Sequence, residues 1–179
     1  MIVFMGVAGS GKSMQGKMLA DHLALPWLST GEFLRMLIAG EKRRDMIAGK
    51  LLTDKEIITL VQKIFTIIDT NEEFVLDGFP RTSAQADWLL SQTKHGQLHI
   101  TAVVHLQATE KTVLERLLAR GRQDDSKAAI AERFKEYEEA TKPILEHFRA
   151  AKVPVYDINA DQTPAAVQTE IIKALESKT

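Results

Sequence analysis

The segment Gly6-Val-Ala-Gly-Ser-Gly-Lys-Ser13 limits the possible folds more than any other part of the chain. It satisfies the pattern Gly-x-x-x-x-Gly-Lys-Ser/Thr, which is typical of a loop that joins a strand to a helix and wraps a phosphate group. Gly9 and Gly11 permit the wrap because glycine adopts left-handed backbone conformations without steric cost. The helix that follows adds unpaired N–H groups and the positive end of its dipole. The segment therefore predicts a nucleotide-phosphate site, and the alternative is an ordinary glycine-rich turn. The predicted binding residues are Gly9, Ser10, Gly11, Lys12 and Ser13.

Within this loop, Lys12 and Ser13 carry the chemistry. A lysine at this position reaches the β- and γ-phosphates of a nucleotide, and the hydroxyl after it is available to a magnesium ion. The motif thus predicts binding of a nucleoside triphosphate with Mg²⁺ and leaves the reaction open.

Short apolar strands alternate with helices along the whole chain. The apolar pattern predicts strands at residues 2–5, 26–28, 73–77, 100–106 and 153–158. It predicts helices at residues 12–25, 30–39, 41–50, 54–69, 82–94, 109–120, 126–150 and 164–177. Such alternation indicates an α/β fold with a five-stranded parallel sheet flanked by helices. Ligands of such sheets bind beyond the carboxyl ends of the strands.

Composition excludes several other functions. The 179 residues fit one domain, and the absence of cysteine excludes a disulfide framework, a thiolate zinc site and a cysteine nucleophile. The net charge of −1 argues against a general nucleic-acid binder, because such proteins have a basic excess. No apolar run approaches the ~20 residues that span a bilayer, and the apolar start has no basic segment before it. We expect a cytoplasmic protein that contacts neither nucleic acid nor membrane.

The third predicted strand, Phe74-Val-Leu-Asp77, ends in a carboxylate. In phosphate-loop enzymes an aspartate at this place serves the magnesium ion, directly or through water. The alternative is a helix-capping or turn residue, because Gly78 and Pro80 follow. Beside the phosphate loop, we interpret Asp77 as the magnesium-side acid.

The arginines form two groups. The guanidinium fork suits bidentate contacts with phosphate, and arginines stabilise the charge that spreads over a transferring phosphoryl group. We interpret one group as holding an acceptor and the other as clamping the transferring phosphate. Acidic residues nearly balance the second group, so its alternative is a solvated, salt-bridged helix pair. The first group is Arg35 and Arg81, and the second is Arg116, Arg120, Arg122 and Arg133.

No general base accompanies these motifs. The histidines are scattered without a partner pattern, and we assign them surface or packing roles. An alcohol acceptor needs its proton removed, whereas a phosphate acceptor is already anionic at neutral pH. The acceptor is therefore expected to be a monophosphate. The histidines are His22, His95, His99, His105 and His147.

Four motifs follow one another in order: residues 6–15, Ser29-Thr-Gly-Glu-Phe-Leu-Arg35, Leu76-Asp-Gly-Phe-Pro-Arg-Thr82 with Gln85, and Arg120-Gly-Arg-Gln-Asp-Asp125 with Arg133. Together they resemble the nucleoside monophosphate kinases, and the short-lid adenylate kinases most. The resemblance runs over essentially the whole chain, and four ordered motifs are more specific than any single one. Thr82 favours AMP as the acceptor, because uridylate and cytidylate kinases commonly carry Asn there.

The resemblance implies a single kinase domain over residues 1–179 with the P-loop NTPase fold. Residues 30–68 would form a small helical insert that binds the nucleoside monophosphate, and residues 120–126 would form a short lid. The implied reaction is reversible, Mg²⁺-dependent transfer of a phosphoryl group from ATP to AMP, giving two ADP. ATP and AMP are the implied partners, and a monomer is expected.

The resemblance also implies roles for single residues. The catalytic residues would be Lys12, Asp77, Arg81, Arg122 and Arg133. The ATP-binding residues would be Gly9, Ser10, Gly11, Lys12, Ser13, Arg116, Arg120 and Gln162. The AMP-binding residues would be Thr30, Gly31, Arg35, Leu52, Gly78, Arg81, Gln85, Arg122 and Arg133. No side chain would hold the metal directly, Ser13 and Asp77 acting through water, and Asp124 and Asp125 would help to position the lid.

Several positions depart from the family pattern. Ala8, Ser13 and Met14 stand where the family usually has Pro, Gly and Thr, although Ser13 restores the hydroxyl of the general motif. Thr53 replaces a common Pro, and Gln162 stands near a glycine expected at the donor adenine. The loop also looks like that of the gluconate kinases, which are not expected to carry the motif that follows the third strand. The alternatives are a kinase for another monophosphate or for a small alcohol such as gluconate, and, in another class, a non-catalytic nucleotide sensor.

Overall fold

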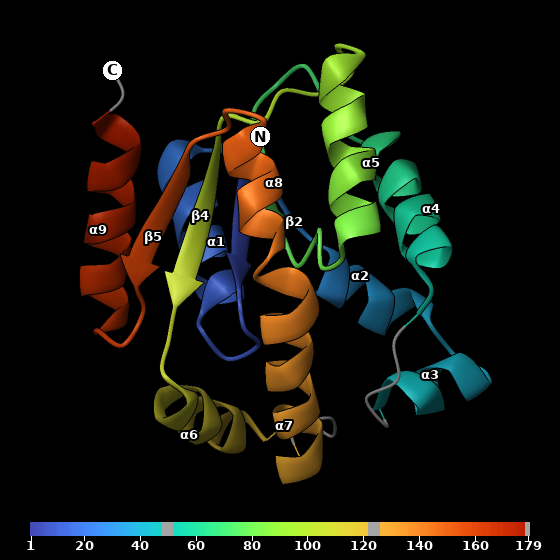
Figure 1. Cartoon of the computed structure of the whole chain (residues 1–179), viewed down its shortest axis with the longest axis vertical. Coiled ribbons are helices and arrows are strands. Elements are labelled where there is room, and N and C mark those ends of the chain that lie inside the picture. The colour runs from blue at the N-terminus through green and yellow to red at the C-terminus, as the bar shows by residue number, and fades with distance from the viewer. Residues whose placement is uncertain (48–51, 122–125, 178–179) are drawn as a thin grey trace.

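The computed structural model describes residues 1–47, 52–121 and 126–177. Within these ranges the chain forms a five-stranded, fully parallel sheet in the order β2-β3-β1-β4-β5 (Figure 1). Each strand overlaps the range expected for it, so the predicted fold class is confirmed. The strands are β1 (Ile2–Gly6), β2 (Trp27–Ser29), β3 (Val75–Asp77), β4 (Ala102–Gln107) and β5 (Val155–Asn159).

Side chains of the central strand β1 alternate between two apolar cores. Val3 and Met5 belong to one core, and Ile2 and Phe4 belong to the other. All four are buried. A strand buried on both faces is expected to read as a continuous apolar run, as β1 does.

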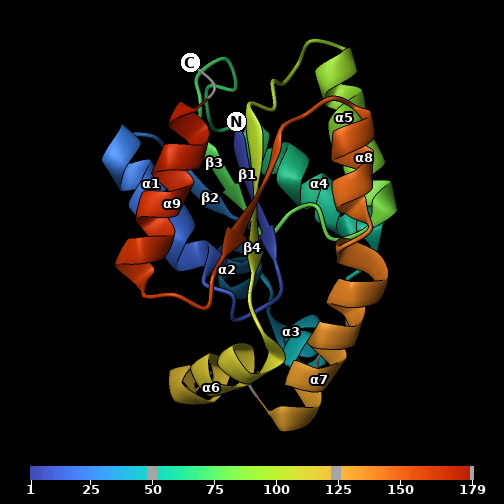
Figure 2. The same ribbon diagram turned by 60° about the vertical axis from the view of Figure 1, so that its left-hand side comes forward.

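Helices cover both faces of the sheet. Helices α1 and α9 lie on one face, and α4, α5 and α8 lie on the other (Figure 2). Helices α6 and α7 lie beyond the carboxyl ends of the strands (Figure 1). Among the described residues, none of the helices has the length and apolar composition needed to traverse a bilayer. The helices are α1 (Lys12–Leu23), α2 (Thr30–Leu37), α3 (Gly40–Ile47), α4 (Asp54–Phe65), α5 (Ser83–Lys94), α6 (Glu110–Arg120), α7 (Lys127–Glu136), η1 (Tyr137–Thr141), α8 (Ile144–Ala150) and α9 (Pro164–Glu176).

Hydroxyl side chains cap most of these helices. Thr53 accepts a hydrogen bond from Glu56 N, and the Glu56 carboxylate accepts one from Thr53 N, which forms a capping box at the start of α4. The capping box explains locally why threonine suits position 53. Ser29, Thr82, Thr109, Ser126 and Thr163 cap α2, α5, α6, α7 and α9 in the same way through a backbone N–H.

The prediction of a single helix over residues 126–150 is wrong, because the middle of this segment is not α-helical. The chain forms α7, then the five-residue π-helical turn η1, and then α8. Lys142 N donates to Tyr137 O at 2.7 Å, which is a bond from residue i to residue i−5. Pro143 follows, and its lack of an N–H removes a donor that a continuous α-helix needs.

Candidate active site

The predicted phosphate loop lies between β1 and α1, at the carboxyl edge of the sheet (Figure 1). Gly9 and Gly11 have φ angles of 88° and 100°, as the wrap requires. Lys12 Nζ donates hydrogen bonds to the carbonyl oxygens of Gly6 at 2.7 Å and Val7 at 2.8 Å. The lysine thus holds the start of the loop, and its ammonium lies within the curve of the backbone.

Neighbouring groups have opposing effects on the pKa of Lys12. Burial lowers the pKa of this ammonium to about 8, and Asp77 opposes the shift by favouring the charged form. Arg81 and Arg120 lower the pKa further. Lys12 is therefore within electrostatic reach of the acid after β3 and of two predicted arginines, so these groups share one region.

Asp77 joins the phosphate loop to the second strand. Its Oδ2 accepts hydrogen bonds from Ser13 Oγ at 2.6 Å and from Ser29 Oγ at 3.2 Å. The side chain is 2% exposed. Asp77 O also accepts from Thr30 Oγ1 at 3.2 Å. Ser13 is thus bonded to the predicted magnesium-side acid.

The described residues contain no group of three or more histidine, aspartate or glutamate side chains that could hold a metal ion. Magnesium does not require such a cluster, because it usually keeps several waters and binds one or two carboxylates plus the phosphates of its nucleotide. The Ser13 hydroxyl and the Asp77 carboxylate supply oxygen atoms, which this hard cation prefers. The residues present therefore fit magnesium.

The predicted acceptor residues meet at the ends of β2 and β3. A Cβ atom added at Gly78 would lie 2.7 Å from Thr30 Oγ1, 3.6 Å from Gly31 N and 3.6 Å from Arg81 Nη2. Gly78 has a φ angle of 85°, so glycine suits both the backbone and the space. A Cβ at Gly31 would lie 3.3 Å from Arg35 Nη2. Two glycines thus bring the backbone and two arginines together.

Arg35 retains an unused donor. Its Nη2 donates to Glu32 Oε1 at 2.7 Å, an ion pair one helical turn apart. Its Nε is buried and has no hydrogen-bond partner among the described residues. A buried donor without a partner costs free energy, and a phosphate oxygen would satisfy it.

The Arg81 guanidinium lies among other charged groups. Desolvation lowers its pKa, Glu136 and Asp77 raise it, and Arg133 and Arg35 lower it. Burial raises the pKa of Glu136, while Arg81 and Arg133 act in the opposite direction. The structure therefore places Glu136 near Arg81 and Arg133, and it places Arg35 of α2 within electrostatic reach of Arg81.

The buried Gln85 side chain forms two hydrogen bonds within the protein. It is 3% exposed, its Oε1 accepts from Arg81 N at 2.9 Å, and its Nε2 donates to Asp54 Oδ1 at 2.8 Å. Thr82 Oγ1 also donates to Asp54 Oδ1, at 2.7 Å. These bonds fix the start of α5 against the start of α4. Leu52 is partly buried just before the Thr53 cap of α4.

Residues that were predicted to bind ATP lie on the other side of the phosphate loop. Arg116 Nη2 donates to Ala160 O at 2.8 Å, and the guanidinium also contacts Ser10 O and Gln162 O, each at 3.4 Å. Gln162 Nε2 donates to Glu170 Oε2 at 2.6 Å and to Asn159 O at 3.0 Å. Arg116 therefore ties the phosphate loop to the turn between β5 and α9.

Arg120 ends α6 with its side chain exposed, and it is near enough to Lys12 to lower the pKa of that lysine. Arg122 lies outside the described residues, as do Asp124 and Asp125.

Sequence reasoning missed three contributors to this region. Glu136 faces Arg81 and Arg133 from the last turn of α7, and its spacing of three residues from Arg133 was an available signal. Thr141 Oγ1 donates to Arg81 O at 2.9 Å. Ser29 completes the partners of Asp77, and its position at the end of a strand beside the site was the signal.

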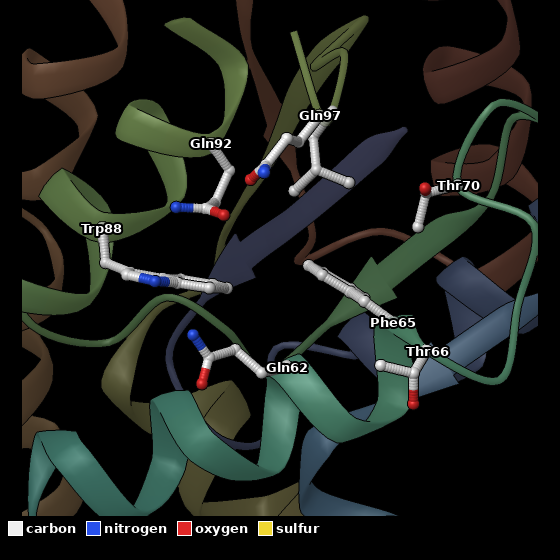
Figure 3. Close-up of a pocket in the computed structure, with 8 residues that line it drawn as sticks. Gln62, Phe65, Thr66, Thr70, Trp88, Gln92 and Gln97 are labelled. Carbon is white, nitrogen blue, oxygen red and sulfur yellow. The ribbon is translucent and has the colours of Figure 1, made fainter. Parts of the chain in front are cut away.

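A cavity of about 290 Å³ lies apart from this site, between α4 and α5 (Figure 3). Phe65 and Trp88 line it, with ring centroids 6.4 Å apart and an angle of 22° between the ring planes. Glutamine and threonine side chains and Leu98 complete the lining. None of the predicted site residues belongs to it.

Comparison with known proteins agrees with this geometry. A family model described as adenylate kinase matches residues 4–153. The chain is 33% identical to an adenylate kinase of Corynebacterium urealyticum, over 98% of each chain. It is 34% identical to one of Oenococcus oeni, over 98% of this chain and 97% of the relative, and 36% identical to one of Rhodopirellula baltica, over 97% and 94%. The chain therefore belongs to the adenylate kinase family.

Proposed function

We propose that this chain transfers the terminal phosphoryl group of ATP to AMP, reversibly, and so forms two ADP. The observation that carries the proposal is the convergence of charge at one edge of the sheet. Arg35, Arg133 and Glu136 all act on the Arg81 guanidinium, and Arg81 is within electrostatic reach of Lys12 in the phosphate loop. Such an arrangement suits two anionic substrates that meet between the loop and α7.

The two sides of the site have different roles in this proposal. AMP lies on the side of β2 and β3, where the buried Nε of Arg35 supplies an unused donor. ATP lies on the side of the loop and α6. The AMP-binding residues are Thr30, Gly31, Arg35, Leu52, Gly78, Arg81, Gln85, Arg122 and Arg133, and the ATP-binding residues are Gly9, Ser10, Gly11, Lys12, Ser13, Arg116, Arg120 and Gln162.

The reaction needs no general base. An oxygen of the AMP phosphate attacks the terminal phosphorus of ATP, the new P–O bond forms as the bond to the bridging oxygen breaks, and ADP leaves. The AMP phosphate is anionic at neutral pH, so no proton has to be removed first. Lys12, Arg81, Arg122 and Arg133 stabilise the charge on the transferring group, and Asp77 orients Ser13.

Mg²⁺ is the proposed cofactor. When bound, it would neutralise charge on the β- and γ-phosphates. Ser13 and Asp77 are the residues that would hold it, through water, because their oxygens lie together at the start of α1.

We also propose a division into a core and two moving parts. Residues 30–68 close over AMP and residues 120–126 close over ATP, which keeps water from the transferring phosphoryl group. The chain works as a monomer, because both sides of the proposed site come from one copy. It acts in the cytoplasm, where ATP and AMP are made and consumed. The other readings, a different acceptor or a non-catalytic sensor, are not needed to account for the site.

The test is an acceptor panel. ADP formation from ATP and Mg²⁺ is measured with AMP, CMP, UMP, GMP, dTMP and gluconate in parallel. Turnover with AMP and little with the others is expected. Turnover with another acceptor in place of AMP would reassign the pocket, and ATP binding without any turnover would leave a nucleotide sensor.

Two variants test the site within the same assay. Lys12→Ala is expected to abolish turnover while the circular dichroism spectrum stays unchanged, since the loop lysine acts on the phosphates. Arg81→Ala is expected to impair use of AMP far more than binding of ATP. An equal loss of both substrates would remove Arg81 from the acceptor side.

A further inference from the structure

His105 occupies a buried position that the proposed reaction does not use. It is 2% exposed, on β4. The parallel register of β4 and β5 pairs it with Asp157, and His105 Nδ1 lies 2.6 Å from Asp157 Oδ1. On its other side, His105 Nε2 lies within hydrogen-bonding distance of the Tyr137 hydroxyl. The two rings stack, with centroids 6.3 Å apart and an angle of 23° between planes.

The direction of these hydrogen bonds follows from the groups present. Burial lowers the pKa of His105 below its ordinary value, so the ring is neutral at pH 7 and has one donor and one acceptor nitrogen. An ionised carboxylate only accepts, so Nδ1–H donates to Asp157 and Nε2 accepts from Tyr137. Burial raises the pKa of Tyr137 to about 12, which keeps its hydroxyl protonated as a donor.

Tyr137 stands where α7 changes into the π-helical turn. Its backbone N–H donates to Arg133 O, which ends α7, and its carbonyl accepts from Lys142 N at 2.7 Å, which closes η1. The position of the Tyr137 side chain is therefore coupled to the place where the turn forms. π-Turns inserted into helices are frequent at functional sites.

Each end of η1 leads to an arginine of the proposed site. Arg133 lies one helical turn before Tyr137, on α7. At the far end, the buried Thr141 donates from Oγ1 to Arg81 O at 2.9 Å. A rotation of η1 would therefore move the backbone of both arginines.

Tyr137 is buried in an apolar cluster with Val7 and Leu117, and apolar contacts have no preferred direction. A cavity of about 280 Å³ adjoins Tyr137, between Val7 of the phosphate loop, the end of β4 and Phe134. Apolar contacts do not direct the hydroxyl and space lies beside the ring, so the bond to His105 defines where the hydroxyl lies. A polar bond in a buried setting has this capacity, since leaving either group without a partner is costly.

We propose that His105 is a positioning residue, whose hydrogen bond to Tyr137 sets the π-turn η1 and thereby aims Arg133 and Arg81 at the transferring phosphoryl group. This inference rests on the proposed phosphoryl transfer. Asp157 fixes the tautomer that the bond requires, and Tyr137 transmits the position to η1.

Two substitutions at His105 separate its two bonds. In His105→Asn the amide reaches the Nδ1 position and keeps the contact with Asp157 but loses Tyr137. In His105→Gln the longer amide reaches the Nε2 position and keeps Tyr137. We expect His105→Asn and Tyr137→Phe to lower kcat about tenfold or more while KM for ATP stays within about twofold, because misaimed arginines act on the transition state. His105→Gln is expected to stay within about threefold of the unmodified chain.

The double variant His105→Asn with Tyr137→Phe is expected to be no slower than either single variant, because both remove one shared bond. His22→Asn, an exposed histidine on α1, is the matched control and is expected to leave kcat unchanged. Equal losses in His105→Gln and His105→Asn, or strictly additive losses in the double variant, would overturn the proposal. So would a fall in melting temperature with kcat unchanged, which is the signature of a merely structural role.

Hydrogen exchange of the Lys142 amide supplies a readout that does not depend on turnover. Loss of the Tyr137 bond is expected to speed this exchange at least about tenfold in His105→Asn and Tyr137→Phe, and not in His105→Gln, because the amide closes η1. Unchanged exchange in all variants would overturn the coupling of His105 to η1. If the unmodified chain and His22→Asn both fail to phosphorylate AMP, the proposed function fails instead, and exchange still decides whether His105 sets the turn.

Discussion

At the scale of single residues, position 78 requires glycine for two reasons: its backbone conformation and the lack of space for a side chain. Its φ angle of 85° is costly for any other residue, and a Cβ would lie 2.7 Å from Thr30 Oγ1. Gly78→Ala is expected to lower the free energy of unfolding by about 1–2 kcal/mol and to raise KM for AMP about tenfold or more. Chemical denaturation and steady-state kinetics measure the two effects.

Gly96 provides the matched control for this prediction. It has a φ angle of 69°, and a Cβ there would meet no atom within 4 Å. Gly96→Ala therefore carries the same kind of backbone strain without the clash. It is expected to lose only the part of the stability that comes from backbone strain and to keep its KM for AMP. A parallel rise in KM in both variants would mean that instability, and not the crowding of Thr30, weakens AMP binding.

Lys12 gives a second prediction at the residue scale. Its pKa of about 8 leaves it about half protonated at pH 8. Bound phosphates favour the charged ammonium and raise this pKa, so ATP binding at pH 8 is expected to take up about half a proton. Titration calorimetry in two buffers with different ionisation enthalpies measures the uptake. Lys12→Arg stays charged in both states and is expected to show none. Equal uptake by both proteins would assign the proton to another group.

At the scale of elements, Asp54 joins α4 to α5. Its Oδ1 at the start of α4 accepts from Thr82 Oγ1 and Gln85 Nε2 at the start of α5. Asp54→Ala leaves the buried Gln85 amide without a partner, which is expected to cost about 1–3 kcal/mol of stability. Because Gln85 also holds Arg81 N, KM for AMP is expected to rise several-fold while KM for ATP does not change.

Asp54→Asn is the control for this element-scale prediction. The asparagine keeps an Oδ1 acceptor and loses only the negative charge, which the dipole of α4 favours by about 0.3–1 kcal/mol. It is expected to retain most of the AMP affinity. A loss as large as that of Asp54→Ala would show that charge near the acceptor side matters more than the two hydrogen bonds.

The elements also show what sequence patterns can predict. Apolar runs with turn residues between them were sufficient for the five strands, because a strand buried on both faces leaves that pattern. The break of residues 126–150 into α7, η1 and α8 was not predicted. The periodicity of α7 continues into η1, and the π-turn depends on the Tyr137 bond to His105, which joins segments distant in sequence.

In the candidate site, too, local motifs could be predicted from the sequence and contacts between distant segments could not. The phosphate loop, Asp77 and Arg81 were predictable because each lies in a local motif beside a strand end. Ser29 as a partner of Asp77, and Glu136 beside Arg81, depend on which strands and helices become neighbours. The histidines were assigned surface or packing roles, but His105 bonds on both sides, since only the β4–β5 register pairs it with Asp157.

At the scale of the whole molecule, the buried His105 links β4, β5 and η1, so its protonation bears on global stability. Burial is the main cause of its lowered pKa, and Arg149 and Lys142 add to the shift while Asp157 opposes it. Glu138 adds a carboxylate on η1, beside the Tyr137 hydroxyl. A histidine whose pKa is lower in the folded chain binds fewer protons there than when unfolded. Stability from this group is therefore present above its ordinary pKa of about 6.5 and is lost as the pH falls through the folded value.

Urea denaturation at several pH values between 7.5 and 5 measures this dependence. The free energy of unfolding of the unmodified chain is expected to fall with acidification below about pH 6.5, and His105→Gln is expected to lack that component because its amide does not titrate. His22→Asn removes an exposed histidine and is expected to keep the full dependence. If His105→Gln follows the same curve as the unmodified chain, the acid sensitivity belongs to other groups, and the bond between His105 and Tyr137 is not weakened by protonation in the folded protein.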